Sequence, residues 1–255
     1  MPAHGFLSPL FLTPSLPRLG RWLDNVSGCW ESLQNAYRYK SALRRRRLLA
    51  HVRYRPPGAL MSIGWWVRLV CKVLDVVAVG EWLTLWGQVI KPGTRPLSAL
   101  EIEEARKVLG ESVPYPQVRV DEHSLLAWVG ALFRLIIQRR FRHLGVVIAY
   151  TVNFTRRIHP APGNEDMAWL IHELVHVAQM EHVGLQYYPE ALAAQFCSGY
   201  DYGGCQALAD GRPLAFFNRE QQGEIARDFY RCLYHSPQRA PYYRRQIGDL
   251  RLGHV

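Results

Sequence analysis

One segment near the middle of the chain constrains the fold most, because its pattern is that of a long, well-capped α-helix. Asn164 is a good capping residue, and Glu165 and Asp166 follow in the first turn, where the helix dipole favours acids. The next apolar residues recur every three or four positions, as on a helix with one buried face. They are Met167, Leu170, Ile171, Leu174, Val175 and Ala178. The sequence therefore predicts a helix that contributes one side to a core.

This helix carries the pattern His-Glu-x-x-His at His172, Glu173 and His176. Two imidazoles four residues apart project from one helical face, one turn apart, so both can reach a single metal ion. Glu173 would then lie beside the open coordination position, where a carboxylate can take a proton from water and return it to a leaving amine. A pattern this short also occurs by chance, but the well-formed helix around it favours a metal site.

A catalytic zinc ion takes three protein ligands and keeps one position open, so a third ligand must come from elsewhere in the chain. His182 has metzincin-like spacing, but that arrangement needs a glycine at the position of Gln179, where the chain turns back. If the helix continues, His182 lies roughly 15 Å along the axis from His172. We therefore expect His182 to be an ordinary histidine near the helix end.

Two glutamates further along the chain are the other candidates for the third ligand. Glu190 follows Pro189 at the start of another helical stretch, and we expect it to be a first-turn acid. Glu220 follows the capping residue Asn218, and Glu224 lies one turn later on the same side of the helix. In a gluzincin-like site the first carboxylate binds the metal and the second hydrogen-bonds a ligand histidine. We predict these roles for Glu220 and Glu224, the alternative being a solvated acidic face.

The sequence of three stretches, 171–179, 199–204 and 218–225, resembles bacterial Vgr-related zincin domains. These metallopeptidase domains are associated with type VI secretion and related contractile injection systems. The resemblance covers roughly residues 97 to 234, including the helix-turn-strand segment expected at 108–120. It implies zinc on His172, His176 and Glu220, with Glu173 as the general base.

One residue departs from what a helix favours. Gly223 lies inside the predicted second metal-binding helix, where glycine costs about 1 kcal/mol relative to a better helix former. It indicates either a close approach to the backbone of the metal helix or a looser helix, and the sequence leaves both open.

The positive charge of the chain is concentrated at its start. Residues 1–60 hold ten Lys and Arg against two acids, whereas residues 61–255 hold twenty-one against nineteen. Because residues 61–255, which contain the predicted metal site, are nearly neutral, the charge of the chain does not support nucleic-acid binding as its main function. We expect residues 1–60, which include the run Arg44 to Arg47, to be a basic and poorly structured extension. Because Met61 opens a stretch typical of a protein start, the extension could derive from an over-long gene prediction.

Residues 61–96 are predicted to form an apolar amphipathic helix and a linker. The stretch 63–90 is long enough to cross a bilayer, but four charged residues interrupt it, each costing about 2.5–3.5 kcal/mol near a membrane centre. They are Arg68, Lys72, Asp75 and Glu81. Tryptophans and cations instead favour a helix that packs in a core or makes peripheral contact with a membrane surface. The breaker segment 91–96 then marks a domain boundary.

The rest of the chain predicts an α+β fold: a mostly helical, zincin-like domain at 97–235 with a small sheet. Ser98 and Glu101 form a capping box at the first helix of this domain. A short strand is expected at 117–120, a helix at 124–142 and a buried strand at 146–154, whose edge could pair with an extended peptide. Residues 236–255 are expected to be a loose basic tail.

These expectations favour a zinc-dependent, peptidase-like protein that hydrolyses a peptide bond with metal-activated water and Glu173 as general base. Its partners would be a peptide or protein substrate and a secretion apparatus, in the bacterial cytoplasm before any export. Tyr187, Tyr200 and Tyr202 could each stabilise an oxyanion, and the sequence prefers none of them. The alternatives are a non-catalytic zincin scaffold that docks in a secretion system and a membrane-surface protein that acts through residues 63–90.

Overall fold

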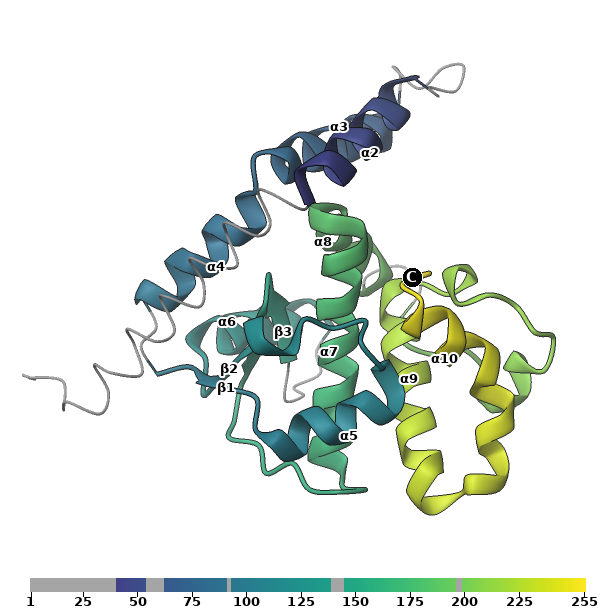
Figure 1. The fold of residues 1–255 in the computed structure, drawn as a ribbon. Coiled ribbons are helices and arrows are strands. Elements are labelled where there is room, and N and C mark those ends of the chain that lie inside the picture. Colours follow the sequence, from purple (N-terminus) through teal and green to yellow (C-terminus); the bar gives the residue numbers. More distant parts are fainter. Residues whose placement is uncertain (1–39, 54–61, 91–92, 139–144, 196–198) are drawn as a thin grey trace, which may run out of the picture.

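The structure is a computed structural model that describes residues 40–53, 62–90, 93–138, 145–195 and 199–255. Its helices surround one small sheet (Figure 1). The longer helices are α2 (Ser41–Arg53), α3 (Ile63–Val76), α4 (Val79–Ile90), α5 (Ala99–Leu109), α6 (Leu125–Gln138), α7 (Glu165–Val183), α8 (Tyr187–Ala193), α9 (Arg219–His235) and α10 (Arg244–Arg251). The strands are β1 (Arg95–Pro96), β2 (Arg119–Glu122), β3 (Gly145–Ile148) and β4 (Thr151–Phe154).

The four strands form a mixed sheet in the order β1-β2-β4-β3. The β1–β2 and β3–β4 pairs are antiparallel, whereas β2 and β4 run parallel, with Val120 opposite Val152. A helix-rich chain around a small mixed sheet confirms the predicted α+β class.

Helix α7 lies at the centre of the molecule, between the sheet and helices α5 and α9 (Figure 1). It begins as the sequence predicts, because the Asn164 side chain accepts a hydrogen bond from the backbone N–H of Met167 at 2.8 Å. The six apolar residues predicted to form the buried face of the helix, among them Leu170 and Leu174, have no exposed surface. This burial fixes which way the opposite, polar side of α7 points.

The predicted single strand at 146–154 is wrong, because the chain turns back within it to form the β3–β4 hairpin. Ala149 takes a positive φ of 50° at the turn, and its backbone N–H donates to the hydroxyl of Tyr188 at 2.7 Å. Alanine carries no turn signal, so the run of β-branched residues conceals the break. The helix expected at 124–142 is described as far as Gln138, and its last residues lie outside the described part.

The expected apolar helix at 63–90 is two helices, α3 and α4, separated by Val77 and Ala78, where Ala78 has a φ of 59°. Asp75 is buried at the end of α3, and its carboxylate accepts a hydrogen bond from the backbone N–H of Leu185 at 2.9 Å. Burial raises the pKa of Asp75, even though this hydrogen bond and Arg44 act in the opposite direction. Within the described residues, no helix combines the length and apolarity needed to cross a bilayer.

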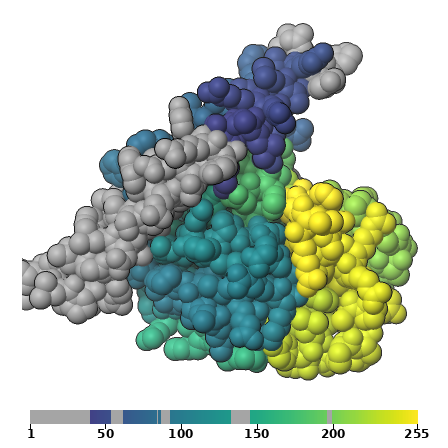
Figure 2. Space-filling model, viewed as in Figure 1, coloured from purple at the N-terminus to yellow at the C-terminus, as the bar shows by residue number. Residues whose placement is uncertain are grey.

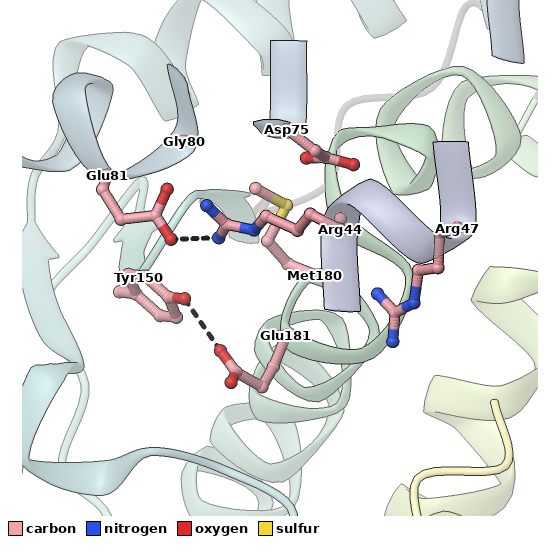
Figure 3. Close-up of a pocket in the computed structure, with 9 residues that line it drawn as sticks. Arg44, Arg47, Asp75, Gly80, Glu81, Tyr150, Met180 and Glu181 are labelled. Carbon is pink, nitrogen blue, oxygen red and sulfur yellow. Dashed lines mark hydrogen bonds and ion pairs between the residues drawn. The ribbon is translucent and has the colours of Figure 1, made fainter. Parts of the chain in front are cut away.

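Residues 41–53 form α2, where we expected no regular structure; residues 1–39 and 54–61 lie outside the described part. Helix α2 packs along α3, and Arg44 forms an ion pair with buried Glu81 of α4 (Figure 3). Lys40 pairs with Glu181 near the end of α7, and the hydroxyl of Tyr150 donates to the same carboxylate at 2.8 Å. These ion pairs hold α2 and the preceding Lys40 against the body of the protein, because they neutralise the buried Glu81 and the partly buried Glu181.

The prediction of a loose tail after residue 235 is wrong. A 3-10 helix, η8 (Pro237–Tyr243), leads into α10, and the two bury Tyr243, Ile247 and Leu250. These three residues are spaced like one face of a helix, but the arginines around them make the composition of the segment resemble a solvated tail. The segment therefore belongs to the same core as α5 and α9.

Candidate metal centre

Helix α7 presents His172 and His176 on its polar side, and both rings are buried. Their ring centroids lie 4.9 Å apart at an angle of 85°, so the imidazoles converge edge to face. Because the apolar side of α7 is locked in the core, these rings point towards α9 rather than towards solvent. The pair therefore has the one-turn spacing that the sequence predicts.

Helix α9 brings Glu220 to the same point. The side chain of Asn218 accepts hydrogen bonds from the backbone N–H groups of Glu220 and Gln221, both at 2.9 Å, so the carboxylate sits in the first turn of a capped helix. Its Oε2 atom lies 3.5 Å from Nε2 of His172 and 3.5 Å from Nε2 of His176.

These three side chains form a cluster that could hold a metal ion. One ligand atom from each lies within 4.8 Å of the others, and all three residues are buried. Ligands bound about 2.0–2.2 Å from a tetrahedral zinc ion lie roughly 3.3–3.6 Å from each other, which matches the measured carboxylate–imidazole separations. The donor set of two imidazoles and one carboxylate fits zinc with one position left open.

Glu224 lies one turn beyond Glu220, and its Oε1 atom is 3.2 Å from Nδ1 of His172. Burial would raise the pKa of Glu224, but His172 outweighs this effect and lowers the pKa to about 2. Burial alone would likewise lower the pKa of His172, whereas Glu220 and Glu224 raise it to about 10. The two carboxylates therefore make the site rich in negative charge and favour positive charge on the ring of His172.

Glu173 points to the side of the cluster that faces β3. Its Oε1 atom accepts a hydrogen bond from Nε1 of Trp169 at 3.1 Å. A Cβ atom at Gly145, the first residue of β3, would lie only 2.1 Å from the same oxygen, so glycine leaves the room that this carboxylate occupies. Burial raises the pKa of Glu173, which makes this carboxylate a better proton acceptor than a solvated one.

Gly223 permits the close approach of α9 to α7. A Cβ atom at this position would lie 2.7 Å from Cε1 of His172. Of the two interpretations that the sequence left open, the close approach is therefore the one that the geometry supports.

Gln179 shares the face of α7 that carries His172 and His176, but the sequence did not predict its contact with His176. It is fully buried, and its Nε2 atom donates to the carbonyl of Arg219 at 3.0 Å and to the side-chain oxygen of Gln222 at 2.8 Å. Since the amide nitrogen is committed there, its Oε1 atom must accept from Nδ1 of His176, 2.9 Å away. This bond leaves Nε2 of His176 as the free lone pair that faces Glu220. The available signal was a polar residue three positions after His176 on the same helical face.

The two other candidate ligands do not join the cluster. Helix α7 continues to Val183, so His182 remains near its end and packs against Gly253, where a Cβ atom would be 2.3 Å from the ring. Glu190 forms an ion pair with Arg219 at 2.7 Å. Both residues are thus placed as the sequence analysis expected.

Of the three candidate tyrosines, Tyr202 is already committed, because its hydroxyl donates to Asp228 at 2.6 Å. The ring of Tyr187 packs 5.4 Å from that of His176, and the ring of Tyr200 lies 6.2 Å from that of His172. Tyr187 and Tyr200 therefore border the cluster, whereas Tyr202 supports the loop beside it.

Comparison with known proteins gives one partial similarity. The chain is 31% identical over 160 residues to the type VI secretion system spike protein VgrG2b of Pseudomonas aeruginosa. The match covers 60% of this chain but only 14% of the spike protein, so the chain corresponds to a small part of that relative. No protein-family model and no solved structure matches the chain.

Proposed function

We propose that this protein is a zinc-dependent, peptidase-like hydrolase. The observation that carries the proposal is the convergence of His172, His176 and Glu220 within 4.8 Å, with the carboxylate of Glu173 beside them. Two helices far apart in sequence supply these groups, and neighbouring side chains orient them. Such an arrangement is typical of a site built for a catalytic metal ion.

Bound zinc would supply Lewis-acid chemistry, polarising a carbonyl and acidifying water. In the proposed mechanism Glu173 accepts the proton that water loses as its oxygen bonds to the peptide carbon. The same carboxyl group then returns that proton to the departing amine as the carbon–nitrogen bond breaks. Trp169 holds the carboxylate through its indole N–H, which limits the rotation of Glu173.

The position of β3 suggests how a substrate could approach. This strand ends the four-stranded sheet and begins at Gly145, the residue in contact with Glu173. An extended peptide added along β3 would continue the sheet through backbone hydrogen bonds and bring a peptide bond towards the base. The proposal therefore favours an extended peptide or an unfolded protein segment as substrate.

The first experiment separates metal binding from chemistry. In Glu173→Gln we expect zinc content equal to that of the wild type but hydrolysis of a fluorogenic peptide library reduced at least about a hundredfold, because the base is lost. Elemental analysis measures the zinc, and His176→Ala serves as the metal-poor control. Undiminished turnover by Glu173→Gln would overturn the mechanism.

A second experiment tests the ligand set. Glu220→Ala should sharply lower bound zinc, whereas His182→Ala should leave it unchanged, because His182 lies outside the cluster. Equilibrium competition against a chromophoric chelator measures both affinities. The reverse pattern would replace Glu220 by His182 as the third ligand.

We further infer an association with type VI secretion, in which the chain acts as a secreted effector. The partial similarity to a spike protein supports this association. It also supports the second candidate function, a non-catalytic zincin scaffold that docks on the apparatus. Wild-type protein that holds zinc but cleaves no member of a broad peptide library would favour the docking module.

A further inference from the structure

Helix α3 exposes its apolar side and buries its acid, Asp75, whereas an ordinary surface helix buries its apolar side. Seven large apolar residues recur at helical spacing along one side, each between 38 and 82% exposed. We call this the apolar face of α3: Ile63, Trp66, Val67, Val70, Val73, Leu74 and, just past the helix, Val77. A contiguous apolar strip of this kind on a protein surface marks an interaction site.

The opposite side of α3 attaches the helix to the body of the protein. Asp75 accepts the backbone N–H of Leu185 there, and Trp65 stacks on His51 of α2 at 5.1 Å. Helix α3 also lies against the 3-10 helix η4 (Gly184–Gln186), which follows α7. Because these contacts fix the rotation of α3, the outward direction of its apolar face is set by the fold.

Positive charge accompanies the apolar face. Helices α2 and α3 lie side by side at one end of the molecule, and α2 protrudes from the rounded body (Figures 1 and 2). Together they contain seven arginines and lysines against a single acid, the buried Asp75. Arg45 and Arg46 of α2 are exposed.

We propose that the α2–α3 pair is a docking surface for an anionic lipid bilayer, with α3 lying in the plane of the interface. An amphipathic helix with tryptophan on its apolar side and cations beside it binds membrane surfaces in this way. Trp66 lies on the apolar face of α3, and Trp82 and Trp86 of α4 are also exposed. Indole rings favour the headgroup region, and clustered arginines are attracted to anionic headgroups.

The same charges disfavour a second copy of the chain as the occupant. A symmetric dimer through the apolar face of α3 would cover the apolar residues but leave the exposed Arg45 and Arg46 of α2 without counter-charges. A bilayer with anionic headgroups instead satisfies the apolar face and the arginines at once. This inference does not depend on the metal centre.

The test is flotation of the full chain with vesicles. Wild-type protein should float with vesicles of phosphatidylglycerol and phosphatidylcholine in equal parts, bind phosphatidylcholine alone at least about tenfold less, and detach as salt rises. The double variant Val70→Glu with Val73→Glu should bind the mixed vesicles at least about tenfold less, since it places charge on the apolar face. Arg45→Glu with Arg46→Glu should lower binding to the same vesicles.

The control is Leu252→Glu, which alters another exposed apolar residue, just beyond α10, and should bind like the wild type. Zinc content and melting temperature of each variant establish that the body remains folded. Equal binding to neutral and mixed vesicles, or wild-type binding by the Val70 and Val73 double variant, would overturn the proposal. So would a wild-type dimer that the same double variant dissociates, because the face would then be a contact between copies.

Discussion

Helices α7 and α3 have opposite relations to their surroundings. On α7, buried polar groups such as His176, Gln179 and Glu173 each have a partner within the chain. On α3, the buried Asp75 also has its partner, but the apolar side faces outward. For a helix that is buried within its own chain, such as α7, the hydrogen bonds and ion pairs of its polar side chains indicate its function. For a helix with an exposed apolar side, such as α3, the surface that no contact covers indicates its function.

The largest effect that tests the α7 side of this comparison concerns Gly223. In Gly223→Ala we expect zinc affinity to fall about a hundredfold and the protein to lose stability, because the new Cβ atom would overlap the ring of His172. A competition titration and a urea unfolding curve measure the two effects.

The control for this prediction is Gly248→Ala in α10, where a Cβ atom meets nothing within 4 Å. That variant should gain about 0.5–1 kcal/mol, as alanine does in helices. If Gly223→Ala is more stable than the wild type and keeps full zinc affinity, the close approach of α9 to α7 does not require glycine at this position.

A smaller effect is expected from the residue that orients His176. Gln179→Met should weaken zinc binding about ten- to a hundredfold, because the imidazole loses the partner that fixes its tautomer. Nitrogen-detected NMR of the metal-free protein should show a mixture of tautomers in place of a single Nδ1–H form. Gln246→Met removes another fully buried glutamine, which bonds the carbonyl of Arg212 away from the cluster. If both variants lose zinc equally, the effect is general destabilisation rather than positioning.

The smallest effect tests how α3 is anchored. Since burial raises the pKa of Asp75, the folded state favours the protonated carboxyl more than the unfolded state does. Its contribution to stability is therefore most favourable below the unfolded pKa and declines as pH rises through the folded pKa. Relative to Asp75→Asn, the wild type should lose unfolding free energy between acidic and neutral pH. Chemical denaturation across that range measures the difference, and a constant difference would contradict the expectation.

Local patterns were sufficient to predict the parts of the structure that depend on neighbouring residues. The cap at Asn164, the spacing of His172 and His176, and the capped start of α9 all follow from helical period and capping chemistry. The choice of Glu220 over His182 also followed from the period, because an uninterrupted helix carries His182 away from the pair.

The features that were missed depend on contacts between distant segments. No sequence pattern near Gly145 predicts its contact with Glu173, and no turn-forming residue predicts the turn at Ala149. The arginines of α2 and α10 resemble solvated tails in composition, yet Arg44 is held by Glu81 and Leu250 is fully buried. Charge composition alone does not distinguish a free tail from a segment whose few apolar or paired residues dock on a core.

The ion pairs between α2 and the body have a consequence for shortened forms of the protein. Lys40 and Arg44 provide the counter-ions for Glu181 and Glu81, and both cations precede residue 54. A proteolytic nick or an internal translation start after that point would leave Glu181 and Glu81 without these two counter-ions. The truncated product would keep the cluster of His172, His176 and Glu220 but lose the five arginines of α2, so under the proposed docking it would bind an anionic bilayer more weakly.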